Sequence, residues 1–433
     1  MTAQPNNSKR RCKDGVLAEY LRYCSGQESP TDFHMWTCLG LLGMAIGRNA
    51  WCNRGAWNLY PNLYIVLIAE SALARKSTAL SMGIRPFQIA LPDIEGLGQK
   101  ITPEQLIGVL STRCKGGEDQ KAEAYIHASE LSVLLGKTTL DDSLIKLLTD
   151  LWDCPDIHTY QTRAKGKEVM RDVCINMLAA STPDWLRNSV PQESLEGGFF
   201  SRLILVQRPS TGERNPFPED IMNSGSISAK ENVIHDLRVI NECVKGPYEW
   251  DIEGKRAYAN WYCEYNNPDS AQSFMRGYYG RKGDFVIKLA MLSAANFSNE
   301  RIITKEDVLF AVKILNENEI FTRELVKFMG TTINGKMYVN VLNKIRNSVV
   351  DYVDANKKKH TVIGISHSDL MRNVGHQLSA KELKDVIEGL EQAGEIEPFF
   401  GGAKGNKKLY RKLTKGKITE QIEDALGDDN GDL

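Results

Sequence analysis

Residues 63–80 read LYIVLIAESALARKSTAL, in which the apolar run Leu63–Ile68 is followed at once by AESALARKSTAL, residues 69–80. A phosphate-binding loop follows a strand in this way. Its backbone amides and the N-terminus of the next helix hold the phosphates, a lysine reaches the outer phosphates and a hydroxyl binds Mg²⁺. Lys76 matches the lysine, and Ser77 or Thr78 matches the hydroxyl. The stretch therefore predicts a strand, a loop and a helix that together hold a nucleotide.

The glycines of such a loop are missing here. In the pattern G-x-x-x-x-G-K-[ST], Glu70 and Arg75 occupy the two glycine positions. Glycine permits unusual backbone angles and a close approach of the backbone to the ligand. Ala69, Ala72 and Ala74 are small enough for the close approach, and less obviously suited to the unusual angles. Taken alone, the stretch leaves an ordinary helix start as an alternative of equal weight.

From Leu63 onward, short apolar runs alternate with helical patterns. Strands are predicted at Ala124–Ser129, Val173–Thr182 and Arg202–Arg208, with an amphipathic helix at Asp142–Trp152. Such an alternation is typical of a mostly parallel sheet covered on both faces. Helices are expected before it at 15–24 and 32–47 and, after a linker at 211–220, as far as about residue 329. The predicted fold class is an α/β P-loop NTPase core with N-terminal helices, an α-helical lid and a C-terminal winged helix.

The predicted organisation follows from these patterns. It comprises an N-terminal helical segment (1–60), the P-loop ATPase core (61–212), a helical lid (213–330), a winged-helix DNA-binding domain (331–415) and an acidic disordered tail (416–433). The winged helix is predicted from helices at Val341–Val353, His367–Val374 and 379–394, a strand at 361–366, and two short strands around a Gly/Asn/Lys turn within 395–413. A helical hairpin is the alternative for this region.

Length and composition set outer limits. The chain has 433 residues with a formal net charge of -1, which suits a globular protein of two or three domains. The longest apolar run, Trp36–Ile46, is too short to span a bilayer, and no export signal opens the chain, so a cytoplasmic protein without membrane contact is expected. Nine cysteines without a CxxC pair argue against a disulfide framework and a zinc knuckle.

Charge is distributed unevenly near the end of the chain. The stretch Gly401–Lys417 carries seven Lys or Arg and no acid, whereas Ile418–Leu433 carries six acids and no base. Such a change of sign favours an element that faces nucleic acid, followed by an acidic tail. A solvated surface with a disordered terminus is an equally weighted alternative.

Three further motifs follow the loop in the order that an ATPase requires. YIHASE, residues 125–130, ends a predicted strand with Glu130, where ATPases place the acid that polarises the attacking water. Ser129 stands where an Mg²⁺-binding Asp is usual. The next strand ends at Ser181, the position of a γ-phosphate sensor. The turn GGFFSRLILV then delivers Arg202, which can reach a nucleotide on a neighbouring subunit as an arginine finger.

Together these motifs carry a resemblance. From about residue 15 to residue 316 the chain resembles a phage- and prophage-encoded family of helicase-like, AAA+-like ATPases. Its hallmarks read here YPNLYIVLIAESALARKST, YIHASEL and GGFFSRL. The Ser-Arg turn is also similar to the arginine-finger segment of minichromosome maintenance helicases. The three alanines stand for glycines of the family loop, and Arg75 agrees with it.

The resemblance implies a site and an assembly. ATP with Mg²⁺ would bind at Ala72, Ala74, Arg75, Lys76, Ser77, Thr78 and Ser181, with Ser77 on the metal. Glu130 would orient the water and Arg202 of a neighbour would complete the site, which requires a homo-oligomer, expected to be a hexameric ring. Arg281 is suggested as a second sensor from the same subunit, with a plain surface arginine as an equal alternative.

Two basic elements are candidates for DNA contact. Residues 158–173 read as a hairpin with Arg163, Lys165 and Lys167 at or near its tip, which in ring helicases projects into the channel and follows one strand. A plain solvated turn is the alternative. The wing offers Lys404, Lys407, Lys408 and Arg411 for phosphate contacts that do not read sequence.

The favoured function is an ATP-driven DNA helicase or translocase of phage or mobile-element replication, in the host cytoplasm, acting on single-stranded DNA in a central channel. The alternative is an ATP-binding initiator or helicase loader, which the substituted loop and Ser129 favour. A defence NTPase shares every motif. The acidic tail is either a docking segment for a replication partner or a solubilising tail, which is favoured.

Overall fold

The computed structural model describes most of the chain. The described residues are 11–71, 73–115, 120–136, 142–162, 166–189, 198–208, 214–221, 224–265, 273–330, 341–353, 358–374, 380–392, 394–401 and 407–412. The chain divides into two compact units, residues 1–330 and 331–433. The predicted segments 1–60, 61–212 and 213–330 all lie within the first unit.

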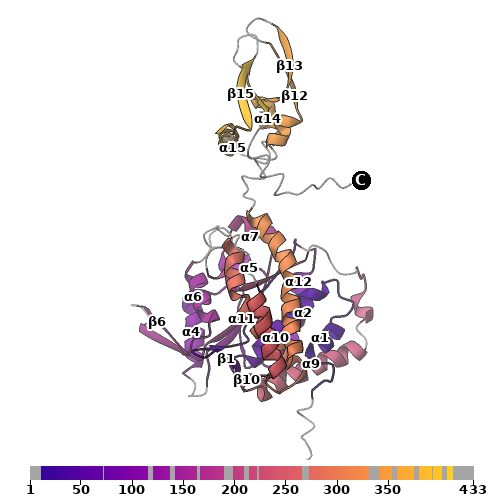
Figure 1. Ribbon diagram of the computed structural model, residues 1–433, viewed down its shortest axis with the longest axis vertical. Coiled ribbons are helices and arrows are strands. Elements are labelled where there is room, and N and C mark those ends of the chain that lie inside the picture. Colours follow the sequence, from indigo (N-terminus) through magenta and orange to yellow (C-terminus); the bar gives the residue numbers. More distant parts are fainter. Residues whose placement is uncertain are drawn as a thin grey trace, which may run out of the picture. The chain divides into compact units, whose positions relative to one another are not determined.

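A five-stranded parallel sheet forms the centre of the first unit (Figure 1). Its strands stand in the order β4 (Glu95–Leu97), β5 (Glu123–Ala128), β8 (Cys174–Ser181), β3 (Tyr64–Ile68) and β9 (Leu203–Gln207). Every neighbouring pair is parallel. The prediction of an α/β fold with a parallel sheet is confirmed. The edge strand β4 was not predicted, because a strand of three residues is too short to show a pattern in the sequence.

Helices cover both faces of this sheet, as β3 illustrates. Successive side chains of a strand point to opposite faces. Ile65 and its neighbour Leu178 lie against Gly40 of α2 (Thr31–Ile46). Tyr64, on the other face, donates a hydrogen bond of 3.0 Å from its hydroxyl to Leu148 O of α6 (Asp142–Trp152). A strand buried on both faces needs an apolar residue at every position, which explains why LYIVLI shows no alternation.

The helices packed on the α2 face are α1 (Val16–Tyr23), α3 (Lys76–Ala90) and α9 (Ser224–Cys243). The apolar run that was too short for a bilayer is therefore a buried core helix. Among the described residues, no helix combines the length and hydropathy of a membrane span.

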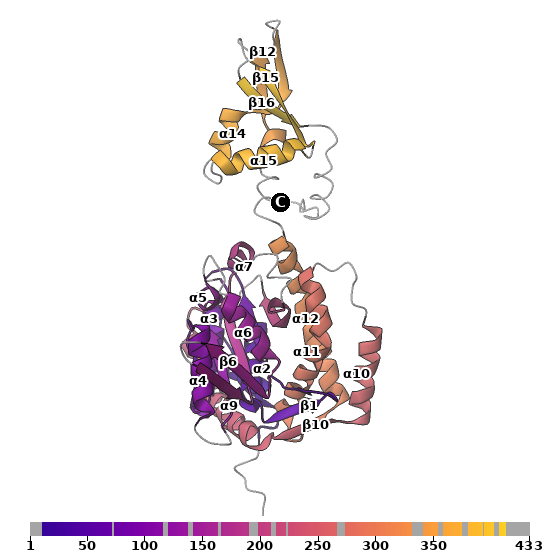
Figure 2. The same cartoon turned by 90° about the vertical axis from the view of Figure 1, so that its left-hand side faces the viewer.

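Three further helices of the first unit are α10 (Ile252–Glu264), α11 (Ser273–Phe297) and α12 (Lys305–Gly330) (Figure 2). A buried ion pair between Lys282 and Glu319 joins α11 to α12, and the Tyr279 hydroxyl donates to the same carboxylate at 2.7 Å. A buried pair of this kind fixes the register of two helices because either partner alone would be an uncompensated charge.

The prediction that the chain is helical throughout this region was wrong in one respect. A second, four-stranded sheet has the order β11-β10-β1-β2, formed by Ile302–Ile303, Gly246–Trp250, Ala50–Asn53 and Asn58–Leu59. Its strands are two to five residues long, and its central pair joins Ala50 of β1 to Gly246 of β10, far apart in the sequence. Local patterns do not reveal such pairings, because a strand this short carries no periodicity.

The remaining elements of the first unit are short. They are α4 (Pro103–Arg113), α5 (Leu131–Leu135), α7 (Pro183–Ser189), the hairpin β6 (Ile157–Thr162) with β7 (Gly166–Arg171), and 3-10 turns η2 (Phe200–Arg202) and η3 (Pro218–Ile221). Figure 1 shows β6 extending away from the parallel sheet.

The second unit has its own core and a second sheet. Residues 341–346 are helical, followed by the hairpin β12 (Val349–Val353) and β13 (Lys359–Ile363). The predicted helix at Val341–Val353 was therefore wrong over its second half, where β-branched residues pair as a strand. The chain continues with β14 (Ile365–Ser366), α14 (His367–Val374), α15 (Ala380–Gln392), β15 (Ile396–Gly401) and β16 (Lys407–Lys412).

The three strands β14, β15 and β16 form one antiparallel sheet with β16 in the middle. Leu370, Leu383 and Leu390 fill the core beneath it and are fully buried. Two helices packed on a small antiparallel sheet are compatible with the winged-helix prediction, which stays a prediction.

Candidate functional site

The loop between β3 and α3 has one unusual backbone conformation. Arg75, the N-cap of α3, has φ 47° and ψ 37° in the left-handed region, one of three described non-glycine residues with positive φ. This is the second glycine position of the phosphate-loop pattern. Ser29 Oγ donates to the Arg75 carbonyl at 3.1 Å, and the Arg75 side chain pairs with Glu28 at 2.8 Å. The backbone thus takes the angles that glycine would favour, and neighbouring residues hold it there.

Lys76 opens α3 and folds back over the start of the loop. Its Nζ donates to the carbonyl oxygens of Ala69 at 2.5 Å and Glu70 at 3.1 Å, and the residue is 8% exposed. Burial lowers the pKa of this amine, and the carboxylates of Glu130 and Glu70 oppose that effect. Carbonyl oxygens are weaker partners for an ammonium group than phosphate, so an anion in this loop would compete for the lysine.

The other predicted loop residues differ in accessibility. Ser77 and Thr78 are exposed on the first turn of α3, whereas Ala74 is buried. The first turn of a helix leaves amide groups without partners within the helix, and its dipole favours an anion there. Ala72 lies outside the described residues.

Glu130 follows β5 after one residue, Ser129, and is the N-cap of α5. It is partly exposed, as is Ser129 before it. Its carboxylate acts electrostatically on Lys76, so the acid predicted to polarise water and the predicted phosphate lysine share one edge of the sheet.

Ser181 lies between these two groups. It ends β8, the strand between β3 and β5, and pairs in register with Ile68. The serine is fully buried, and its Oγ has no hydrogen-bond partner among the residues that the structure describes. A buried hydroxyl without a partner is costly and calls for an explanation. Thr182 has a different role, because its Oγ1 accepts from Trp185 N at 3.3 Å and starts α7.

The resemblance implies a bound Mg²⁺, and the described residues that could hold it stand at the carboxyl edge of the parallel sheet. No group of three His, Cys, Asp or Glu side chains within the described ranges could hold a metal by itself. Mg²⁺ in nucleotide sites is bound by one or two protein oxygens together with phosphates and water. The exposed Ser77 hydroxyl and the Glu130 carboxylate fit that requirement.

Arg202 lies elsewhere in the unit. It is 8% exposed, and its two terminal nitrogens donate to Gly198 O at 2.8 Å and Asp153 Oδ2 at 2.9 Å. Its guanidinium lies 5.4 Å from the centre of the Trp152 ring. A Cβ at Gly198 would come within 2.7 Å of this guanidinium, so a larger residue there would have to displace the Arg202 side chain. Acting on a neighbouring subunit would require Arg202 to leave Asp153.

Arg281 joins the same cluster. Its Nε donates to Ser201 Oγ at 3.1 Å and its guanidinium lies 5.6 Å from the Trp152 ring. Burial and the nearby Arg202 both lower its pKa. Within the described residues it makes no hydrogen bond or ion pair to the 69–78 loop. The structure therefore brings together the predicted finger and the predicted second sensor, and keeps both apart from Lys76.

A buried hydrogen-bonded pair, Lys288 and Asn62, lies beside the Trp152 ring and was not predicted from the sequence. Lys288 is 1% exposed and donates to Asn62 O at 3.0 Å and Asn62 Oδ1 at 2.6 Å, with its Nζ 3.9 Å from the Trp152 ring. Asn62 Nδ2 donates to Trp152 O and Ile175 O at 3.0 and 3.2 Å. Asn62 ends the YPN stretch noted in the sequence, and its structural role is to join α6, β8 and α11.

Of the predicted hairpin residues, Lys167 is exposed on β7 and pairs in register with Gln161. Arg163 and Lys165 lie outside the described residues. The buried Arg48 holds the two ends of this hairpin together. It donates hydrogen bonds to the carbonyls of Cys154 and Val173 and forms ion pairs with Asp156 and Asp172.

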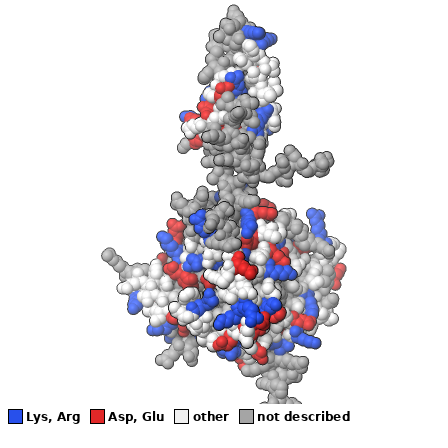
Figure 3. Space-filling view, viewed as in Figure 1, with Lys and Arg blue, Asp and Glu red and all other residues white. Residues whose placement is uncertain are grey.

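The wing residues have partners within the chain. Lys408 lies 3.8 Å from Glu391, and Arg411 pairs with Glu397. Lys407 begins β16, and Lys404 lies outside the described residues, as does the acidic tail at 416–433. On the face of residues 1–330 seen in Figure 3, basic and acidic side chains are interspersed. The described charges therefore do not form a purely basic surface on that face.

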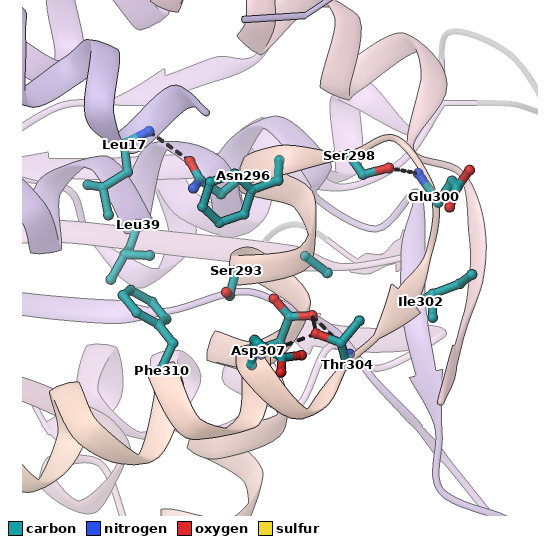
Figure 4. Close-up of a pocket in the computed structure, with 13 residues that line it drawn as sticks. Leu17, Leu39, Ser293, Asn296, Ser298, Glu300, Ile302, Thr304, Asp307 and Phe310 are labelled. Carbon is teal, nitrogen blue, oxygen red and sulfur yellow. Dashed lines mark hydrogen bonds between the residues drawn. The ribbon is translucent and has the colours of Figure 1, made fainter. Parts of the chain in front are cut away.

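A separate cavity of about 590 Å³ lies among α1, α2, α11, β11 and α12 (Figure 4). Leu17, Leu39 and Phe310 form its apolar wall, and Asp307 is occupied by hydrogen bonds from Thr304 N and Oγ1 at 2.9 and 2.8 Å. It shares no residue with the 69–78 loop.

Comparison with known proteins adds no family to this picture. No protein-family model matches the chain, and the search of curated proteins gave no match. The resemblance to helicase-like ATPases therefore stays a prediction, and the loop that begins α3 is the site on which a function has to be argued.

Proposed function

We propose that the protein is an ATP-dependent DNA helicase or translocase, with ATP and Mg²⁺ bound at the loop between β3 and α3. One observation carries the proposal: Arg75 has the left-handed backbone of a phosphate-loop glycine, next to a buried lysine whose amine, within the described part of the chain, donates hydrogen bonds only to loop carbonyls. An ordinary helix start needs neither feature. A loop that binds phosphate uses both.

The strand order supports the chemistry of hydrolysis. The strand that ends at Ser181 stands between the strand before Lys76 and the strand before Glu130. In a parallel sheet the carboxyl ends meet at one edge, and ligands bind where the connections change direction. The connection from β3 runs to β4 at one edge of the sheet, and the connection from β8 runs to β9 at the opposite edge. The end of β3 therefore lies where the connections change direction. Lys76 would hold the outer phosphates, Ser181 would bond the γ-phosphate and Glu130 would orient water.

A second candidate, an initiator or helicase loader that binds ATP without processive unwinding, is favoured by a specific observation. Arg202 is held within its own chain by Asp153 and Gly198, and Ser129 replaces the usual metal-binding acid. A site that binds ATP to drive assembly requires Lys76 and the loop. It does not require Arg202 to be released.

The test is ATP hydrolysis with and without single-stranded DNA. Lys76→Ala should abolish ATP binding, Glu130→Gln should bind ATP without turnover, and Lys100→Ala, an exposed lysine outside the loop, should behave as wild type. If Arg202 completes a neighbouring site, a mixture of the Arg202→Ala and Lys76→Ala proteins should recover part of the turnover. ATP binding without turnover in the wild type would reject the motor and leave the loader.

A further inference from the structure

Two buried cysteines face each other at the base of the β6–β7 hairpin. The ladder pairs Ile157 with Arg171, and the backbone bonds Asp172 N to Asp156 O at 2.9 Å and Val173 N to Pro155 O at 3.2 Å continue it. The same register sets Cys154 directly opposite Cys174. Residues opposite each other on antiparallel strands have the separation that a disulfide requires.

The two side chains belong to one buried cluster. Both are free cysteines, and they share this cluster with Tyr60. The Cys154 thiol donates to Trp152 O at 3.7 Å, and the two thiols affect each other's pKa in opposite directions. Cys154 itself has a left-handed backbone, with φ 52°.

The environment makes the two thiols unequal. Burial alone would raise the pKa of Cys154, but the hydrogen bond from Cys174 and the cations of Lys288 and Arg48 outweigh it, so that pKa is lowered. The pKa of Cys174 is raised, first by its hydrogen bond to Cys154 and then by burial. One sulfur is thus suited to attack as a thiolate and the other to stay a thiol.

A small cavity reaches Cys154, the member of the pair with the lowered pKa. It has a volume of about 260 Å³ and is lined by Cys154 together with Lys288, Asp153, Asp284 and other residues of the β2–β3 and α11 segments. Buried thiols are usually inert for lack of access. A cavity of this size admits hydrogen peroxide and excludes a folded oxidoreductase.

We propose that Cys154 and Cys174 form a peroxide-responsive thiol pair that closes a reversible disulfide across the hairpin base. The Cys154 thiolate attacks one peroxide oxygen, the O–O bond breaks, and the leaving hydroxide takes up a proton to become water. The Cys174 sulfur then attacks the sulfur of the resulting sulfenic acid, the S–O bond breaks, and a second water leaves with the Cys174 proton. Two thiols and one peroxide give one disulfide and two waters. The bond would join the end of α6 to the start of β8 and hold the base of the hairpin closed, whether or not the chain hydrolyses ATP.

The experiment uses the full-length folded protein, treated with hydrogen peroxide, blocked with N-ethylmaleimide and digested with trypsin. Cys154 falls on peptide 147–163 and Cys174 on peptide 172–187, so mass spectrometry identifies a link directly. Two internal references are available. Cys263 is exposed, and the buried Cys24, whose pKa is raised to about 12 by desolvation, lies near Cys38 in an apolar core.

We expect the 154–174 link to form under peroxide and to disappear with dithiothreitol, while Cys24 and Cys38 stay thiols. In Cys174→Ser, Cys154 should stop at sulfenic acid and be labelled by dimedone. In Cys154→Ser, Cys174 should remain unlabelled. The proposal is rejected if both cysteines remain thiols under peroxide that fully oxidises Cys263, or if dimedone labels Cys174 in preference to Cys154. Circular dichroism of each variant establishes that it is folded.

Discussion

Lys288 offers a prediction about stability that the structure makes quantitative. The amine is fully buried, and burial lowers its pKa from 10.5 to about 8, while nearby Cys154 and Asp284 oppose that change. Below pH 8 the lysine is charged in both the folded and the unfolded state, and the folded state bears the cost of burying the charge. Between about pH 8 and pH 10.5 the folded protein has lost the proton and the unfolded chain still carries it. Because the unfolded state then binds more protons, the free energy of unfolding rises with pH, by about 3 kcal/mol in all.

The perturbation that isolates this contribution is Lys288→Met, which keeps length and removes the titration. The free energy of unfolding of the wild type minus that of the variant should increase by about 3 kcal/mol from pH 8 to pH 10.5. Urea titrations with dithiothreitol present would measure it by tryptophan fluorescence, since all seven tryptophans lie in residues 1–330. Lys255→Met, at an exposed position of α10, is the matched control and should give a difference that does not vary with pH. A flat difference for Lys288→Met as well would show that this amine is not desolvated as described.

Substitutions at four further positions test the backbone and the Trp152 cluster. Arg75→Gly should be more stable than Arg75→Ala by about 1 kcal/mol in urea unfolding, since both lose the ion pair and only glycine accepts the left-handed backbone without strain; equal stabilities would contradict this. Gly43→Ala should cost about 1–3 kcal/mol, because its Cβ would lie 2.8 Å from a backbone carbonyl of the loop before β3. Gly108→Ala, with open space around it, should be neutral or slightly stabilising in the same thermal unfolding assay. Asp153→Asn should lower stability by about 1 kcal/mol, because Arg202 is buried but the carboxylate is half exposed; an unchanged melting temperature would mean that the pair contributes nothing.

The sequence predicts the strands of the parallel sheet well, and a physical reason accounts for it. β3, β5, β8 and β9 are largely buried, so each is a mostly apolar run that the local sequence pattern reveals. The polar exceptions are Glu123 and His127 in β5, Asn176 and Ser181 in β8, and Gln207 in β9. The amphipathic helix α6 was predicted with its observed bounds for a similar reason, since one face is buried and the other is polar. The four-stranded sheet that contains β10 was not predicted, because its pairing depends on residues far apart in the chain and not on a local pattern.

The site was predictable in composition and less so in geometry. Lys76, Ser181 and Glu130 stand after three adjacent strands, and the rule that parallel strands end at one edge brings them together. The burial of Arg202 and the location of Arg281 beside it could not be foreseen, because both depend on Trp152 and Asp153, which come from another element. The unusual backbone at Arg75 also leaves no mark in the sequence, since arginine is rare in that conformation.

The hydrogen bonds that reach the sheet from α11 and α12 have a mechanical consequence. Lys288 of α11 donates a hydrogen bond to Asn62, just before β3. Asn318 and Thr322 of α12 both donate to the Leu205 carbonyl of β9, at 2.9 and 3.1 Å. These attachments lie on two different strands and are buried, so α11 and α12 cannot move away from the sheet as a hinged lid without breaking both. The two helices and the parallel sheet should therefore move as one body. If the chain acts as the motor proposed above, a movement driven by ATP would have to occur between neighbouring subunits.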